Sequence, residues 1–511
     1  MNKIIVEISK YLLLLLMVFF TMETFMVLKK KNEKARRRIM RKQILLMLLF
    51  NFAAYFVMYL QSNDIYMILL YGGVVIYMLA VQGFYRLIYK KASLILLNTM
   101  CMLLSIGFII QARLDMTTAV KQLLIVSVST TLSFIVPVLV RKVKLVRDLT
   151  WLYGILGILL LAGVFLFAKV SGGGKLSVSI GGITFQFSEF VKITFVFFIA
   201  GMLQEVTDFH QVFKVTVVAG IHVVILVISK DLGAALIYFV AYIVMVYVAT
   251  HKARYALLGL GGMALASTAA YHLFSHIRVR VSVWLDPFAD YENTGYQIVQ
   301  ALFGVCAGGW FGTGLFGGSP ETIPLAKEDF TFAAICEEMG ILFAICLILL
   351  CMGTYLLIVN IAVKMSKPFY KLIAIGLGTE YAFQVFLTIG GTTKFIPMTG
   401  ITLPLVSYGG SSVMCTILML AIIQGLYILR KDEDKQFEEE KRATRGGEPR
   451  QAPLPADRPR ADYRQSSQAN YRQPARRKPD SGRPQGHAGE SQEPDDLERR
   501  IEEQTEKSLN W

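Results

Sequence analysis

Long apolar runs alternate with short polar segments along the first 430 residues of the chain. A helix that crosses a bilayer needs about 20 apolar residues, so this pattern predicts about thirteen membrane spans and an all-α polytopic membrane protein. Three spans are expected first, near 5–28, 43–61 and 65–84. Ten more are expected near 93–112, 122–140, 149–169, 187–204, 213–229, 231–249, 255–274, 330–360, 371–392 and 411–429.

Basic residues gather in short clusters between the apolar runs. The clusters are Lys29 to Lys42, Arg86/Lys90/Lys91, Arg141/Lys142/Lys144/Arg147, Lys252/Arg254, Lys364/Lys367/Lys371 and Arg430/Lys431. With thirteen spans every cluster falls on one side of the membrane, which the positive-inside rule assigns to the cytoplasm. We therefore expect the N-terminus outside, the C-terminus in the cytoplasm, and the polar segments 275–329 and 393–410 on the outer face.

The composition and charge of the chain bear on its binding partners. Hydrophobic residues make up 54% of the chain and charged residues 17%, against about a quarter charged in a soluble protein. The formal charge of +15 would suggest nucleic acid in a soluble chain. Because the cations lie between apolar runs, we expect contact with anionic membrane lipid and no nucleic-acid partner. The 6 Cys form no CxxC pair and indicate packed thiols, not disulfides or metal ligands.

The chain loses its apolar character at Lys431. Residues 431–511 are rich in Arg, Gln, Pro, Glu and Ser and have few aliphatic residues before the end. Such a segment cannot bury enough apolar surface to fold, so we expect a disordered cytoplasmic tail. At the other end, the apolar run from Tyr11 lacks a small-residue cleavage site, which indicates a retained span instead of a signal peptide.

The segment 275–329 is the largest polar stretch between two spans, and it ends in a candidate catalytic carboxylate. Asp329 precedes a long apolar helix, where an isolated Asp would be interpreted as an N-cap. Its position at the membrane surface and beside a Gly-rich run favours a functional role. Glu337 and Glu338 follow inside the span, where charges are costly. They indicate either a functional pair or a hydrogen-bonded pair that packs helices, and both interpretations stay open.

The Gly-rich run from Gly304 to Gly318 matches no phosphate-binding fingerprint, because it lacks the Lys-Ser/Thr ending of a P-loop and follows no strand. It predicts close backbone approach and re-entry into the bilayer. The preceding residues QIVQALFGV predict a short amphipathic helix on the surface. A Pro- and Gly-broken segment from Thr392 to Ser412 also lies at membrane depth, which is tolerated only where backbone lines a cavity or is buried.

Three cations could meet on the outer side. Lys192, Lys230 and Arg280 all flank outward-facing segments, and several cations together suit an anionic head group such as a pyrophosphate. Two pairings compete with this interpretation. Glu189 and Lys192 share a helix face at i, i+3, and Lys230 is followed by Asp231, so each pair could neutralise itself. His272 and His276 have no acidic or Cys neighbours at zinc spacing, and no metal site is predicted there.

Five motifs together resemble the SEDS family (shape, elongation, division and sporulation) of the RodA/FtsW/SpoVE type. They are QFSEFVK at 186–192, KDLGAA at 230–235, the run from Arg280 through WLDP to GYQ at 295–297, EDFTFA at 328–333 with EEMG at 337–340, and PMTG at 397–400 through SYGGSS at 407–412. The resemblance implies a ten-span catalytic core over 93–430. Residues 1–92 are then accessory N-terminal spans.

The resemblance implies a peptidoglycan glycosyltransferase with roles in cell shape, division or sporulation. Members polymerise lipid II, the lipid-linked disaccharide-pentapeptide, on the outer face of the bacterial cytoplasmic membrane, and they work with a class B penicillin-binding protein. The family's essential acid falls on Asp329. Substrate-binding candidates are Arg280, Lys192, Lys230, Glu189, Gln297, Glu338 and Ser411. No cofactor is certain, although a divalent cation remains possible.

The sequence departs from the family pattern at several motif positions. Phe187 stands where Pro is usual, Leu325 where Glu is common, and Glu328 where Thr is common. Thr388 and Lys394 replace Asn and a small residue. Because Glu328 adjoins Asp329, its charge is expected to raise the pKa of Asp329 or to share its role.

The mechanistic hypothesis is that Asp329 removes a proton from the acceptor sugar 4-hydroxyl, while Arg280, Lys192 and Lys230 neutralise a polyprenyl pyrophosphate leaving group. An alternative class is a flippase for the lipid-linked precursor, with Glu189, Lys192 and Glu338 along its pathway. A third is a non-catalytic scaffold that docks partners through the extra spans and the tail, for which changes at Asp329 would be harmless.

Overall fold

The structure is a computed structural model that describes residues 2–30, 32–141, 147–167, 178–180, 183–205 and 208–446. The chain divides into two units, Met1–Gly447 and Glu448–Trp511, and the second lies outside the described residues. Most of the segment predicted to be a disordered tail therefore lies outside the description.

Each of the thirteen predicted spans corresponds to a helix. The first three are α1 (Asn2–Lys29), α2 (Glu33–Ser62) and α3 (Ile65–Ile88). The others are α4 (Leu94–Leu114), α5 (Met116–Ser133) continued by α6 (Val136–Arg141), α8 (Thr150–Phe167), α9 (Phe187–Leu203), α10 (Phe209–Ile228), α11 (Leu232–Thr250), α12 (Ala253–Leu273), α15 (Thr331–Val363), α16 (Pro368–Thr392) and α17 (Gly410–Gly446). Within the described ranges, eleven helices are long and apolar enough to cross a membrane, and α8 and α9 are shorter. The all-α polytopic fold is confirmed.

The polar segments contain structure that the apolar pattern did not predict. Residues 275–329 hold α13 (Ser275–Leu285), α14 (Tyr296–Gly308) and a short 3₁₀ turn, η1 (Pro320–Thr322). Helix α14 is the short helix predicted before the Gly-rich run. A hairpin of two three-residue strands, β1 (Val178–Ile180) and β2 (Ile183–Phe185), precedes α9. Helix α17 continues to Gly446, so the predicted disorder does not begin at Lys431.

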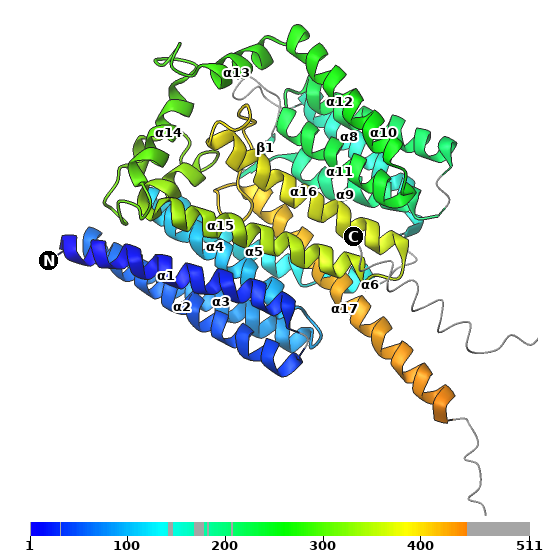
Figure 1. The fold of residues 1–511 in the computed structure, drawn as a ribbon, viewed down its shortest axis with the longest axis horizontal. Helices are drawn as coiled ribbons and strands as arrows, with labels where there is room; N and C mark the ends of the chain where they lie inside the picture. The colour runs from blue at the N-terminus through cyan, green and yellow to red at the C-terminus, as the bar shows by residue number, and fades with distance from the viewer. Residues whose placement is uncertain are drawn as a thin grey trace, which may run out of the picture. The chain divides into compact units, whose positions relative to one another are not determined.

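The N-terminal helices α1, α2 and α3 lie against α4 and α15 (Figure 1). Buried amides join them to the rest of the bundle. Gln43 donates to Thr24 at 3.0 Å and accepts from Asn98 at 3.1 Å, while Asn51 donates to Ser105 at 3.0 Å. Lipid tails offer no hydrophobic gain for helix association, so such bonds and close packing are what select these partners.

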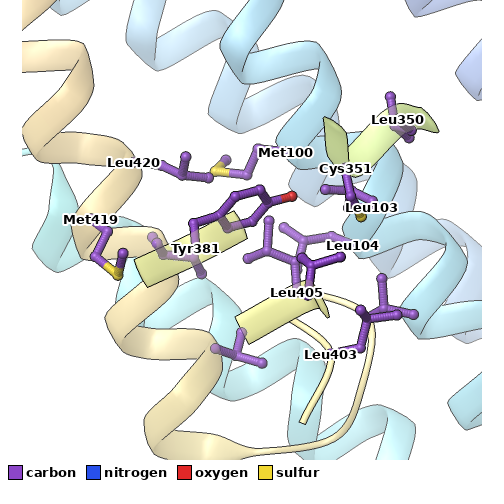
Figure 2. Close-up of a cluster of buried hydrophobic side chains, with 14 of the residues drawn as sticks. Met100, Leu103, Leu104, Leu350, Cys351, Tyr381, Leu403, Leu405, Met419 and Leu420 are labelled. Carbon is purple, nitrogen blue, oxygen red and sulfur yellow. The ribbon is translucent and has the colours of Figure 1, made fainter. Parts of the chain in front are cut away.

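A buried apolar cluster fixes the broken segment 393–409 inside the bundle (Figure 2). The ring of Tyr381 on α16 lies among side chains of α4, α15 and α17, and Leu405 of the broken segment packs beside it. Gly107 on α4 permits this approach, because a Cβ there would lie 2.7 Å from the carbonyl oxygen of Val406. The segment is therefore buried in protein, as backbone at membrane depth requires.

Helix α15 is interrupted at Gly340, which has φ 86° and ψ 167°. The Gly-rich loop fills the break. The N–H groups of Thr313 and Gly314 donate to the carbonyls of Glu337 and Glu338 at 2.9 and 2.8 Å. In return, N–H groups just after the break donate to loop carbonyls. The outer part of α15 is thus bonded to the loop as well as to its own inner part, which the uniform apolar pattern of 330–360 did not predict.

Helix α1 contacts the same loop from the other side. Lys10 donates to the carbonyl of Gly312 at 3.3 Å, and the rings of Tyr11 and Phe311 have centroids 5.3 Å apart. A Cβ at Gly314 would lie 2.4 Å from a methyl group of Val6, so the two backbones pack closely. The loop is held between α1 and the break in α15.

Substituting Gly340 with Ala is expected to destabilise the protein. A Cβ at this position would lie 2.3 Å from the N atom of Gly312, and φ is in the left-handed region. Strain of this kind costs about 1–3 kcal/mol. The measurement is the melting temperature in detergent, with Gly262→Ala as control because a Cβ at Gly262 meets nothing within 4 Å. An unchanged melting temperature for Gly340→Ala would contradict the interruption of α15 at Gly340.

Candidate active site

The turn that carries Asp329 is bound to two other parts of the bundle. The carbonyl of Lys327 accepts hydrogen bonds from the Gln111 side chain at 2.8 Å and from the Tyr408 N–H at 2.7 Å. The Lys327 amine pairs with Asp115 at 2.9 Å. These contacts come from α4, the α4–α5 junction and the broken segment, so three elements fix the backbone two residues before Asp329.

Asp329 itself is partly buried, and its carboxylate is not a helix cap. Helix α15 begins at Thr331, and its N-cap residue is Phe330. Among the described residues no donor is hydrogen-bonded to the Asp329 carboxylate, although its carbonyl accepts from Thr392 at 3.4 Å. Burial and the neighbouring Glu328 raise the pKa of Asp329 to about 6, and Arg280 opposes that rise. The group is therefore largely ionised at neutral pH and is more basic than an ordinary Asp.

Helix α13 places Arg280 beside this carboxylate. Arg280 and Trp284 share a helix face and donate to the carbonyls of Met398 at 3.0 Å and Lys394 at 3.2 Å. A Cβ at Gly400 would lie 3.7 Å from the Asp329 carboxylate and 4.0 Å from the Arg280 guanidinium, so the two charged groups flank this glycine. Burial lowers the pKa of Arg280, and the charge of Asp329 opposes that shift.

Lys230, the second predicted cation, lies near His276 of α13. It is exposed, with φ 66°. Burial and the charges of Lys230 and Arg280 lower the pKa of His276, so these cations lie near one another. The competing pair of Lys230 with its neighbour is not formed. The Asp231 carboxylate instead accepts from Ser188 at 2.9 Å, from Gln186 at 3.2 Å and from the helix it caps.

Lys192 does not join the other two cations. Its side chain is 2% exposed, and its amine lies 2.6 Å from Glu189 and 2.8 Å from the Gln384 side-chain oxygen. The i, i+3 pairing weighed from the sequence is thus present. Ser411 lies nearby in this network and accepts from the N–H of Gln186 at 3.0 Å. These residues support α9 and the broken segment from inside the bundle.

Glu337 and Glu338 bind the Gly-rich loop. Glu337 accepts from the N–H of Ser319 at 2.7 Å. Glu338 is fully buried, pairs with Arg113 at 2.6 Å and accepts from the N–H of Phe316 at 3.1 Å. These contacts bind α15 to the loop and to α4, and a functional role for the two carboxylates stays a prediction. Arg113 at the end of α4 lies outside the five motifs, and a basic residue ending a span gave no signal of this role.

Thr388 and Lys394, which depart from the family pattern, contact the broken segment or α13. The Thr388 hydroxyl donates to the carbonyl of Ile401 at 2.9 Å, and the Lys394 amine donates to the carbonyl of Leu285 at 3.3 Å. Both unusual residues therefore hold the broken segment, one against α16 and the other against α13. Gln297 is exposed on α14, and its binding role stays a prediction.

A small pocket adjoins Asp329. It is lined by α16 and the broken segment, including Thr388, Thr392 and Gly400, and its volume is about 10 Å³. Ligand pockets are usually about 300–1,000 Å³, so this conformation admits only part of a large substrate. The arrangement supplies a proton acceptor and a fixed guanidinium at the surface, which suits deprotonation of a hydroxyl next to an anionic group. Within the described residues no group of three His, Cys, Asp or Glu side chains could hold a metal, and the divalent cation stays a prediction.

Comparison with known proteins decides the family. The sequence profile of the FtsW/RodA/SpoVE family, described as cell cycle proteins, matches residues 85–431, more than half of the chain. The chain belongs to the FtsW/RodA/SpoVE family. As a family member it retains the five motifs within the matched range. Helices α1 and α2 lie wholly before it.

Two curated relatives carry names of enzymes. "Peptidoglycan glycosyltransferase RodA" of Mycobacterium tuberculosis is 37% identical over 270 residues, which are 49% of this chain and 57% of the relative. "Probable peptidoglycan glycosyltransferase FtsW" of Aliivibrio salmonicida is 32% identical over 280 residues, which are 53% of this chain and 70% of the relative. The FtsW/RodA/SpoVE member described here therefore spans little more than half the length of the first relative.

One solved structure shares the fold. It is described as "Structural coordination of polymerization and crosslinking by a peptidoglycan synthase complex", and its matched chain has a TM-score of 0.58 and 24% identity. The match covers 66% of this chain and 98% of that chain. The shared fold agrees with the many-span core that the resemblance implied.

Proposed function

We propose that this chain is a peptidoglycan glycosyltransferase that polymerises lipid II into glycan strands on the outer face of the bacterial cytoplasmic membrane. The observation that carries the proposal is the partly buried, unbonded carboxylate of Asp329 beside Arg280. The names of the family relatives support the reaction class. The chain is a multi-pass membrane protein, and we propose that its N-terminus lies outside and its C-terminus in the cytoplasm.

In the proposed reaction Asp329 takes the proton of the acceptor sugar 4-hydroxyl. The resulting oxygen nucleophile attacks the anomeric carbon of the donor, and the bond from that carbon to the pyrophosphate oxygen breaks. The bonding electrons leave with the polyprenyl pyrophosphate, whose negative charge Arg280 and Lys230 neutralise. A positioned general base contributes about 10²–10⁴ in rate. Positioning and fixed positive charge supply the remainder.

The test is polymerisation of labelled lipid II by the purified full chain, with and without a class B penicillin-binding protein. We expect glycan polymer, and we propose that such a protein is the partner that crosslinks it. The solved complex, described in terms of polymerization and crosslinking, supports this pairing. Absence of polymer under both conditions, with a correctly folded protein, would overturn the proposed activity.

The flippase alternative has less support. A transport pathway would use Glu189, Lys192 and Glu338, and each is bound within the protein. Glu189 and Lys192 pair with each other, while Glu338 pairs with Arg113. In the described residues these two networks share no member. Transfer of labelled lipid II across a vesicle membrane by the purified chain, without polymer formation, is the result that would restore this alternative.

Substituting Glu328 with Gln is expected to extend activity toward lower pH. Asp329 acts as a base only when ionised, so the rate should rise with pH through a pKa of about 6. The negative charge of Glu328 raises that pKa, and its removal should lower it. Arg280→Met should move the acidic limb the opposite way, since a neighbouring cation is lost. The measurement is initial polymerisation rate against pH, and an unmoved acidic limb in both variants would argue against Asp329 as the titrating base.

A further inference from the structure

A basic cavity lies at the opposite end of α4 from Asp329. The Asp329 turn is bound by Gln111 near the C-terminal end of α4, whereas the cavity is lined by Ser93 at its start. A helix of 21 residues is about 30 Å long, so the two sites lie at opposite faces of the membrane. The cavity has a volume of about 480 Å³, within the range of ligand pockets. It lies between the start of α2, the α3–α4 connection and α17.

The cavity is lined by more positive than negative side chains. Seven of its lining residues are Arg or Lys, and only one is acidic. That acid, Glu33, lies 3.6 Å from Arg37 and 3.8 Å from Lys431. Lys91 pairs outside the cavity with Asp432 at 2.5 Å. The remaining four lining cations have no carboxylate within 4.0 Å among the described residues, and these are Arg36, Arg41, Arg86 and Lys90.

Two buried features point to an anionic ligand. The Nε atom of Arg36 is buried and has no hydrogen-bond partner among the described residues, which is costly for a cationic donor. Helix α4 begins in the cavity with Ser93 as an N-cap that makes no side-chain cap bond. The positive end of a 21-residue helix therefore adds to the field of the side chains. Burial and the charges of Arg430, Arg36 and Lys431 also lower the pKa of the nearby Lys364.

Apolar residues line the cavity beside these cations. Met40 and Ile95 are buried in a small apolar cluster with Val27 and Leu357, and the partly buried Leu94 packs against it. The cavity lies at the ends of membrane-spanning helices, where the head groups of lipids lie. Basic pockets between spans on the cytoplasmic side are known to suit phosphate head groups of lipids.

We propose that this cavity binds the head group of an anionic phospholipid from the inner leaflet. Its phosphate groups face Arg36, Arg41 and Arg86, and its acyl chains extend past the partly buried Leu94 into the bilayer. Arg suits this task because its planar fork donates two parallel hydrogen bonds to phosphate oxygens. Most of these residues belong to helices that lie before or at the edge of the family match, so the site is a feature of the accessory spans. The inference does not depend on the proposed enzyme activity.

The test is native mass spectrometry of the full chain after reconstitution in phosphatidylcholine nanodiscs that contain cardiolipin or phosphatidylglycerol. The wild type should retain bound anionic lipid. The triple variant Arg36→Gln/Arg41→Gln/Arg86→Gln should bind it about 100-fold more weakly, since each basic residue at a membrane surface contributes about a fivefold factor. The matched control is Lys34→Gln/Arg38→Gln/Arg254→Gln, which loses the same charge from cytoplasmic clusters but from residues that do not line the cavity.

Equal weakening in both triple variants would mean diffuse attraction to the membrane and would overturn the proposal. Competition by inorganic pyrophosphate separates the two sources of phosphate. If pyrophosphate binds the wild type and displaces the lipid, the site serves a soluble phosphate compound and the lipid assignment is wrong. Should the triple variant fail to fold, Arg41→Gln is compared with Arg38→Gln on the same helix, and equal lipid retention by these two would overturn the proposal.

Discussion

Purified Asp329→Asn is expected to polymerise lipid II about 10²–10⁴ times more slowly than the wild type. The amide keeps the size of the side chain but cannot accept the acceptor hydroxyl's proton at neutral pH. Because no donor among the described residues is hydrogen-bonded to the carboxylate, the substitution breaks no bond of the fold, and the melting temperature should stay unchanged. The readout is the length distribution and initial rate of glycan polymer from labelled lipid II.

Glu328→Gln is the matched control for this experiment, since it removes a neighbouring exposed carboxylate from the same turn. It should retain activity at neutral pH. A normal rate for Asp329→Asn would remove the base from the mechanism. Loss of activity in both variants would instead point to a carboxylate pair that shares the role, which is the alternative that the departure at Glu328 raised.

Arg113→Met is expected to produce the largest loss of stability of any single change considered for the loop. The Arg113 side chain is 9% exposed and pairs at 2.6 Å with Glu338, which is 0% exposed. Its guanidinium also donates to the carbonyl of Gly318 at 3.1 Å and lies 4.3 Å from the centre of the Phe316 ring. Removing one partner of a buried pair leaves an uncompensated charge and costs about 3–5 kcal/mol. Thermal unfolding in detergent measures the effect.

Two further variants separate the buried pair from the exposed one. Glu321 also pairs with Arg113, at 3.2 Å, but is 55% exposed, so Glu321→Gln should cost at most about 1 kcal/mol. The double variant Arg113→Met/Glu338→Leu should recover much of the loss, because no buried charge is then left alone. A melting temperature of Arg113→Met equal to that of Glu321→Gln would contradict the buried pair.

The membrane made most of the fold predictable from the sequence. Backbone in lipid must satisfy its own hydrogen bonds, so apolar length alone located thirteen helices. Prediction from the sequence failed where the backbone of a helix depends on contacts with residues distant in the chain. Nothing in the apolar run from 330 to 360 predicts a break at Gly340, because the break depends on hydrogen bonds from residues 309–314.

The candidate site was predictable from the sequence only in part. The motifs singled out Asp329, Arg280 and Lys230. The structure brings Arg280 beside Asp329, whereas the charge of Lys230 acts with that of Arg280 on His276. Sequence could not tell which way Lys192 points, since that depends on Gln384 in another helix. It also could not assign Arg113 to Glu338, 225 positions apart in the chain, because a basic residue at the end of a span ordinarily faces lipid head groups.

The contact of α1 with the Gly-rich loop connects the accessory helices to the part of α15 that follows Asp329. Val6 of α1 packs against Gly314, whose N–H donates to the carbonyl of Glu338, nine positions after Asp329. Lys10 and Tyr11 contact the preceding loop residues Gly312 and Phe311. A protein that bound the outer surface of α1 and shifted this helix would thereby move Asp329 without contacting it. Spans added at one edge of the bundle thus reach the Asp329 turn while the residues of that turn stay unchanged.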